Sequence, residues 1–261
     1  MSHVETLSLA DGTPLVVRLD EPAEGAPERS AAILYLHGFR SDQAGEKAEF
    51  FRGRATADGF LFCSFDFRGH GVSGGDLGSA HMTRNLVDVE RAHDFLAGRW
   101  SGPVVVLGSS MGGATALWHA VRRPDDVAAV LCIAPAVGLG RRLEAWAGDE
   151  GLTEWERTGL RRWVDDRGQV DLAWDVVLDL RRYPPEELGD ELGRLGKPLL
   201  LLQGQRDEKV DWQGTVELAR RAGAGPVDLH LFTDGDHRLV DRKERLWTLM
   251  REFLEGRGLT F

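Results

Sequence analysis

The sequence predicts an α/β domain: a doubly wound, mostly parallel sheet with a small helical cap inserted after the sixth strand. Two observations lead to this class. Short apolar segments that are typical of buried strands alternate with helix-forming segments over most of the 261 residues. Between residues 138 and 193 the alternation stops, and charged residues with four tryptophans replace the apolar runs. We therefore expect a core of residues 1–137 and 194–261 and a cap of residues 138–193.

The strands follow from apolar runs bounded by turn residues. VETLSLA and PLVVRLD, joined by the turn ADGT, predict an antiparallel hairpin at one sheet edge. Six further apolar segments predict the other strands: AAILYLHG, FLFCSFD, VVVLG, VAAVLCIA, KPLLLLQG and VDLHLF. Helices are expected between them at residues 46–57, 83–96, 111–121, 212–222 and 243–255. This alternation requires helices on both faces of the sheet.

The cap region has its own pattern. Thr153 and Glu156 have the spacing of a capping box, which predicts a helix that begins near Thr153 and carries Trp155 and Trp163 on one face. No strand is expected there. The tryptophans have two interpretations that stay open: they anchor the cap to the core, or some of them line an acyl pocket.

Composition excludes several functional classes. A formal net charge of -10 provides no basic surface for nucleic acid. The longest apolar segment, residues 127–137, is about half of the roughly 20 residues that a membrane-spanning helix needs, so no membrane span is expected. The N-terminus lacks the pattern of a secretory signal. Cys63 and Cys132 lie in strand-like runs and are expected to be buried thiols, which favours a cytoplasmic location.

The nucleophile candidate comes from a G-x-S-x-G pattern, which occurs twice. Residues 71–75 place Ser73 in a glycine-rich loop, where serine is an ordinary turn residue. Residues 108–112 place Ser110 between a strand and a helix, the context of a nucleophile elbow. We therefore expect Ser110 to be the nucleophile and the hydroxyl of Ser109 to brace the turn.

A serine nucleophile needs a base and a carboxylate that orients the base. Asp207 and His237 each follow a predicted strand, and their order along the chain is the one that this fold uses. The carboxyl ends of parallel strands meet at one sheet edge, so both residues should lie beside Ser110. The alternatives for the carboxylate are Asp211, Asp234 and Asp236. His119 and His230 are interpreted as structural.

The oxyanion of the tetrahedral intermediate needs two N–H donors. The N–H of Met111, which follows the nucleophile at a helix N-terminus, is one candidate. The other is the N–H of Phe39 in the loop after the first parallel strand. His37 is expected to stabilise this loop rather than to transfer protons.

Five segments together resemble an α/β-hydrolase with a helical cap: Leu36–Phe39, Asp66–Gly74, Gly108–Gly113, Gly204–Asp207 and Gly235–His237. More narrowly, GFRSDQAGEKA, LGSSMGG, DEKVDW and DHR resemble the abhydrolase subgroup of acyl-protein thioesterases that also cleave acyl-glucuronides, and its bacterial carboxylesterase relatives. The resemblance implies hydrolysis of esters or thioesters without a cofactor or metal. Serine aminopeptidases share much of the pattern.

These observations predict a serine hydrolase that cleaves small carboxylic esters through Ser110, Asp207 and His237. An acyl-protein or acyl-CoA thioesterase, a serine peptidase or amidase, and a carbon–carbon bond hydrolase would use the same residues. The alternative from another class is a non-catalytic binding module on the same fold. The presence of all three residues argues against it.

Overall fold

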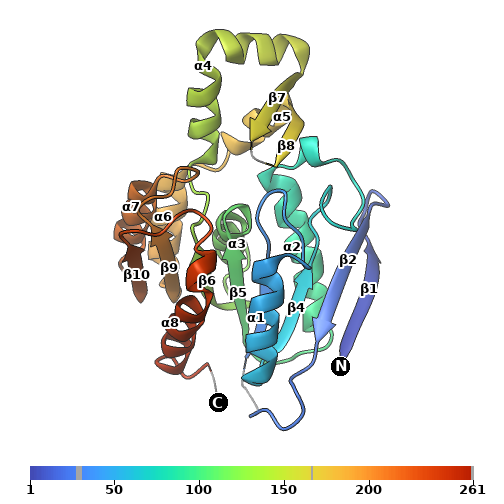
Figure 1. Cartoon of the computed structure of the whole chain (residues 1–261), viewed down its shortest axis with the longest axis vertical. Coiled ribbons are helices and arrows are strands. Elements are labelled where there is room, and N and C mark those ends of the chain that lie inside the picture. Colours follow the sequence, from blue (N-terminus) through green and yellow to red (C-terminus); the bar gives the residue numbers. More distant parts are fainter. Residues whose placement is uncertain (28–30, 166, 260–261) are drawn as a thin grey trace.

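The computed structural model describes residues 1–27, 31–165 and 167–259, which form a central sheet with helices on both faces (Figure 1). The sheet has eight strands in the order β1-β2-β4-β3-β5-β6-β9-β10. Strand β2 pairs antiparallel with β1 and β4, and the other pairs are parallel. The strands are β1 (Ser2–Ser8), β2 (Pro14–Asp20), β3 (Ala32–Leu36), β4 (Leu61–Phe65), β5 (Val104–Ser109), β6 (Val127–Ile133), β9 (Leu199–Gly204) and β10 (Val227–Phe232).

Five helices lie at the predicted places in the core: α1 (Glu46–Ala57), α2 (Met82–Ala97), α3 (Met111–Arg122), α7 (Trp212–Ala222) and α8 (Lys243–Glu255). Side chains of the central strands point alternately to two buried clusters. In β3, Leu34 packs in the cluster under α2, α3 and α7, while Ile33 packs in the cluster under α1 and α8. The predicted fold class is confirmed.

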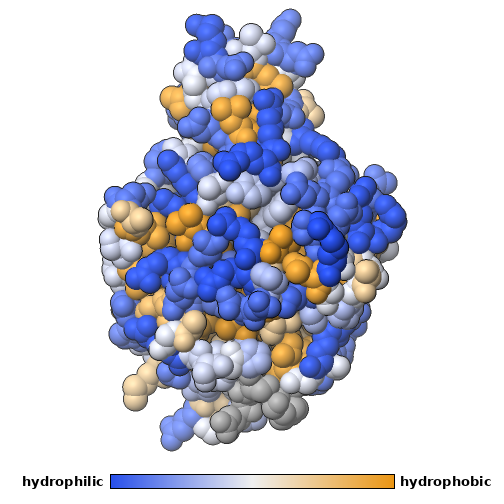
Figure 2. Space-filling model, turned by 180° about the vertical axis from the view of Figure 1, so that it is seen from behind, coloured by the Kyte–Doolittle hydropathy of each residue, from blue (hydrophilic) through white to orange (hydrophobic). Residues whose placement is uncertain are grey.

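The inserted region contains α4 (Leu139–Thr158), β7 (Leu160–Asp165), β8 (Gly168–Ala173), α5 (Trp174–Leu180) and α6 (Pro185–Leu195). Most of it projects as a narrower lobe above the core, as the view from behind shows (Figure 2). Helix α6 crosses the boundary expected at residue 193, and its Leu188 and Leu192 pack into the core cluster beneath α3 and α7. The division into core and cap stays a prediction.

Two expectations about the cap were wrong. Helix α4 begins well before Thr153 and turns sharply at Gly148, whose φ of 64° lies in the left-handed region (Figure 1). Thr153 lies inside the helix, where its hydroxyl donates to the carbonyl of Asp149. Residue Trp163 belongs to β7, which pairs with β8 in an antiparallel hairpin, so the cap is not purely helical.

The cap tryptophans mainly pack against one another. Trp155 is fully buried, and its indole N–H donates to the carbonyl of Leu172 at 2.9 Å. Its ring contacts those of Trp146 and Trp174, and Trp146 also contacts Trp163. These rings therefore give the cap a small core of its own, which explains why a segment rich in charge can fold.

Cys63 and Cys132 are buried free thiols, as predicted. No helix in the described part of the chain is long and apolar enough to cross a bilayer.

Candidate active site

Ser110 stands between β5 and α3 in a strained turn. Its φ of 54° and ψ of -117° lie in a region that costs a residue with a side chain about 1–3 kcal/mol. The neighbouring strand supports the turn, because the Ser110 N–H donates to Ile133 and the Ser110 carbonyl accepts from Ala136. Such a turn lifts the hydroxyl above the carboxyl edge of the sheet.

The glycines of the turn are needed for close backbone approach. A Cβ at Gly108 would lie 2.3 Å from the carbonyl oxygen of Gly112. A Cβ at Gly112 would lie 2.2 Å from the carbonyl oxygen of Leu36 on β3. Any side chain at either position would push the elbow away from the sheet, so the G-x-S-x-G pattern has a steric cause here.

The structure brings Ser110, His237 and Asp207 together from loops that are far apart in the sequence. The Ser110 Oγ lies 3.1 Å from His237 Nε2, and His237 Nδ1 lies 2.8 Å from Asp207 Oδ2. The His237 side chain is 20% exposed, whereas the Asp207 carboxylate is buried. The hydroxyl and imidazole are therefore positioned for proton transfer at a site that solvent can reach.

Asp207 is held in one orientation by several donors. Gln203 Nε2 donates to its Oδ2 at 2.9 Å, and the N–H groups of Lys209 and Val210 donate to its Oδ1 at 2.8 Å. Burial raises the pKa of Asp207, but the hydrogen bond and charge of His237 and the other donors outweigh it, so the net pKa is lowered. An ionised carboxylate only accepts hydrogen bonds, so His237 carries its proton on Nδ1 and accepts from Ser110 through Nε2.

Gln203 was not predicted, although the sequence holds a signal for it. It is the one polar side chain in β9, and it is fully buried. A buried amide requires partners, and its Oε1 accepts from the Thr215 hydroxyl at 3.2 Å. Gln203 thus helps to hold the Asp207 carboxylate in one orientation.

The alternative carboxylates all have local roles. Asp211 caps α7 by accepting from the Gln213 N–H at 3.0 Å. Asp234 forms an ion pair with Arg242 at 2.6 Å. Asp236 accepts from the N–H groups that follow His237 and so shapes its loop.

Ser73 and the remaining histidine candidates lie in structural positions. The Ser73 hydroxyl donates to the Asp66 carbonyl at 2.6 Å and accepts from the Val16 N–H at 2.9 Å. His119 is buried in α3, 2.8 Å from a ring nitrogen of His93. His230 belongs to strand β10.

The two predicted oxyanion donors belong to segments next to Ser110. Met111 is the first residue of α3, and the loop of Phe39 passes so close that a Cβ at Gly38 would lie 3.3 Å from Ser110 Cβ. Within the described residues, neither the Phe39 N–H nor the Met111 N–H donates to a backbone carbonyl. Both remain available for a negatively charged oxygen.

His37 stabilises the loop that carries Phe39, as predicted. Its Nε2 accepts from the Phe67 N–H at 3.0 Å, so Nδ1 carries the proton and donates to the Gly38 carbonyl at 2.8 Å. Burial lowers the pKa of His37 to about 4, which keeps the ring neutral in this tautomer. The Gly38 carbonyl and the Phe39 N–H belong to one peptide plane, so His37 orients the N–H that faces away from it.

Lys47 is a second residue that sequence reasoning missed. Its Nζ lies 2.6 Å from the Oγ of Ser109, the residue before the nucleophile. Burial, with the charges of Arg238 and Arg167, lowers the pKa of Lys47 to about 8. The predicted bracing of the turn by Ser109 therefore takes the form of a hydrogen bond from helix α1.

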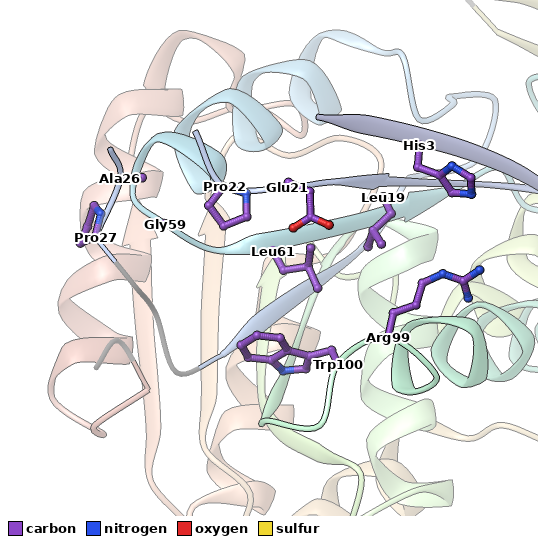
Figure 3. Close-up of a pocket in the computed structure, with 10 residues that line it drawn as sticks. All are labelled: His3, Leu19, Glu21, Pro22, Ala26, Pro27, Gly59, Leu61, Arg99 and Trp100. Atoms are coloured by element: carbon purple, nitrogen blue, oxygen red, sulfur yellow. The ribbon is translucent and has the colours of Figure 1, made fainter. Parts of the chain in front are cut away.

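Two cavities differ in their relation to this site. A large pocket of about 670 Å³ lies at the opposite edge of the sheet, where Trp100, Glu21 and Leu61 line it (Figure 3). Ligands of doubly wound sheets bind at the carboxyl ends of the strands, so this pocket is not the catalytic one. A small apolar cavity of about 20 Å³ lies between α3 and the cap, lined by Ala114, Ala136 and other apolar residues.

In the described ranges, no group of His, Cys, Asp or Glu side chains could hold a metal ion.

Comparison with known proteins identifies the family of this chain. The family model of serine aminopeptidase, S33 (Hydrolase_4), matches residues 27–165. The mouse protein named palmitoyl-protein thioesterase ABHD10, mitochondrial, is 29% identical over 220 residues, which are 83% of this chain and 72% of the mouse protein.

Solved structures have the same fold. A putative hydrolase from Agrobacterium vitis S4 is 26% identical with a TM-score of 0.83, covering 97% of this chain and 98% of its own. Mouse α/β-hydrolase domain-containing protein 10 is 24% identical with a TM-score of 0.80, covering 97% and 99%. The chain therefore belongs to the Hydrolase_4 family (serine aminopeptidase, S33), a family of serine hydrolases with the α/β-hydrolase fold.

Proposed function

We propose that this hydrolase cleaves carboxylic esters through an acyl-enzyme on Ser110. The observation that carries the proposal is the continuous chain of contacts from Ser110 Oγ to His237 and on to Asp207, with distances of 3.1 and 2.8 Å. Ser110 also occupies a strained conformation, which is common for residues at functional sites.

The reaction follows from the positions of these groups. His237 Nε2 takes the proton of Ser110 as Oγ attacks the acyl carbon, and Asp207 balances the charge of the imidazolium. The Phe39 and Met111 N–H groups stabilise the oxyanion. His237 then protonates the leaving alcohol, and water attacks the acyl-enzyme with the same base.

The small apolar cavity between α3 and the cap offers little space for an acyl group. Its volume of about 20 Å³ accommodates roughly one water-sized group. A long acyl chain would not fit in this cavity. We therefore propose small acyl esters as substrates.

Thioester hydrolysis is the second candidate, because a relative that is 29% identical over 83% of this chain is named a palmitoyl-protein thioesterase. A thiolate leaves more readily than an alkoxide, so the same residues could serve both bonds. A panel of p-nitrophenyl esters of increasing chain length, acyl-CoA and arylamides would rank the ester, thioester and amide bonds.

The decisive test is covalent labelling. A fluorophosphonate should add one phosphonyl group to the wild-type protein and none to Ser110→Ala. Ser73→Ala, which changes the other G-x-S-x-G serine, should still be labelled. An adduct on Ser73, or no adduct on the wild type, would overturn the proposal.

A further inference from the structure

Arg167, the residue before strand β8 of the cap hairpin, contacts the loop that carries Phe39. Arg167 Nη1 donates to the carbonyl of Phe39 at 3.3 Å and to that of Arg40 at 3.0 Å. These contacts join residues 128 and 127 positions apart in the chain. The guanidinium of Arg167 is therefore bound to the backbone of the loop next to the nucleophile.

The loop in turn holds the hairpin. Arg40 Nη1 lies 2.5 Å from Asp165 Oδ1 and 3.3 Å from the carbonyl oxygen of Gly168, and Nη2 donates to the carbonyl of Arg167. Asp165 also accepts from the Arg167 N–H at 2.8 Å. The two arginines thus form a reciprocal set of contacts across the boundary between cap and core.

Arg40 occupies a conformation that needs such support. Its φ of 58° lies in the left-handed region, which is unfavourable for a residue with a side chain. Strain of this kind persists only where the surroundings enforce it. The bound guanidinium of Arg40 and the Arg167 donor on the Arg40 carbonyl supply that constraint.

We infer that Arg167 is a positioning residue of the oxyanion hole, through which the seated cap hairpin holds Phe39 in its catalytic orientation. The inference rests on the proposed function. Phe39 has two peptide units: His37 holds the one that contains its N–H, and Arg167 holds the one that contains its carbonyl. Rotation of Phe39 about its φ and ψ angles is therefore blocked from the core side and from the cap side.

The Phe39 side chain adds a second connection. It packs against both the core cluster and the cap cluster, and it meets the His70 ring edge to face at 5.6 Å. Displacement of the hairpin would remove the Arg167 donor and one wall of the Phe39 ring together. The orientation of the Phe39 N–H therefore depends on contacts from the cap as well as from the core.

The test compares Arg167→Ala with Arg162→Ala. Arg162 lies in the same hairpin, where its guanidinium pairs with Asp171 of the neighbouring strand at 2.8 Å. Arg167→Ala should lower kcat by about 10- to 100-fold, somewhat less than the loss of an oxyanion donor causes, with KM changed less than threefold. Arg162→Ala should keep the wild-type kcat. Arg167→Lys should have a kcat between those of Arg167→Ala and the wild type.

Inhibition by a trifluoromethyl ketone is a second measurement, and a purely structural role of Arg167 would not change the inhibition constant. Its adduct with Ser110 carries an oxyanion, so its inhibition constant should rise in Arg167→Ala by about the factor by which kcat falls. Both exposed arginines should alter the melting temperature by less than about 2 °C.

The outcomes separate this inference from the proposed function. If the wild type is labelled by a fluorophosphonate and Arg167→Ala keeps wild-type kcat and inhibitor affinity, the positioning role is wrong. A rise in KM alone would assign Arg167 to substrate binding and would also overturn the inferred positioning role. Failure of wild-type labelling would instead reject the proposed function.

Discussion

Replacing Gly112 by alanine tests whether the elbow depends on close backbone contact. The new Cβ would lie 2.2 Å from the Leu36 carbonyl oxygen and 2.5 Å from that of His37. Ordinary contact begins at 3.4 Å, so the backbone would have to separate by about 1 Å. We expect a loss of about 1–3 kcal/mol in unfolding free energy and, because a shift of 1 Å misaligns the nucleophile, a loss of about 100-fold in kcat.

Gly53→Ala is the matched control. Gly53 is exposed within α1, and a Cβ there would meet nothing within 4 Å. Alanine lowers backbone entropy in the unfolded state and should stabilise the protein by about 0.5–1 kcal/mol. Ester hydrolysis and urea unfolding would be measured for both variants. If Gly112→Ala kept wild-type kcat and stability, the steric account of the elbow would be refuted.

Three other predictions follow from groups around the site. Burial lowers the pKa values of His37 and His119 to about 4 and 3, so both rings stay neutral in the fold while the unfolded chain takes up protons below pH 6.5. The unfolding free energy should therefore fall as the pH drops from 6.5 towards these values, by about 2 kcal/mol per histidine at pH 5. Equal urea midpoints at pH 7 and pH 5 would contradict this. Lys47→Met should lower the unfolding free energy by about 1–3 kcal/mol, because the Ser109 hydroxyl loses its donor. A double-mutant cycle with Ser109→Ala should show a coupling energy between the two residues. Additive effects would mean that the contact is unimportant. Asp207→Asn should lower kcat by about 10³- to 10⁴-fold with KM little changed, because the amide can donate to the imidazole and favour the wrong tautomer; steady-state kinetics on a short ester would check it, and a loss below tenfold would argue against Asp207 as the orienting carboxylate.

Local patterns were sufficient to predict the core. Each strand is a run of apolar residues that ends at a turn signal, so its position depends on its own segment and not on distant partners. The ends of parallel strands meet at one edge by topology, and this is why residues at the tips of β5 and β9 and in the loop after β10 could be expected together. The strained turn at Ser110 was also predictable, since glycines on both sides of a serine are a local signal.

The cap and the supporting residues depended on contacts that no local pattern encodes. Strand β7 lacks a clear apolar alternation, and it becomes a strand because its partner β8 and the tryptophan cluster stabilise it. Lys47 and Arg167 each bind a residue more than 60 positions away. A single donor and its acceptor leave no periodic trace in a sequence, because their meeting depends on how whole elements pack and not on the spacing between neighbours along the chain.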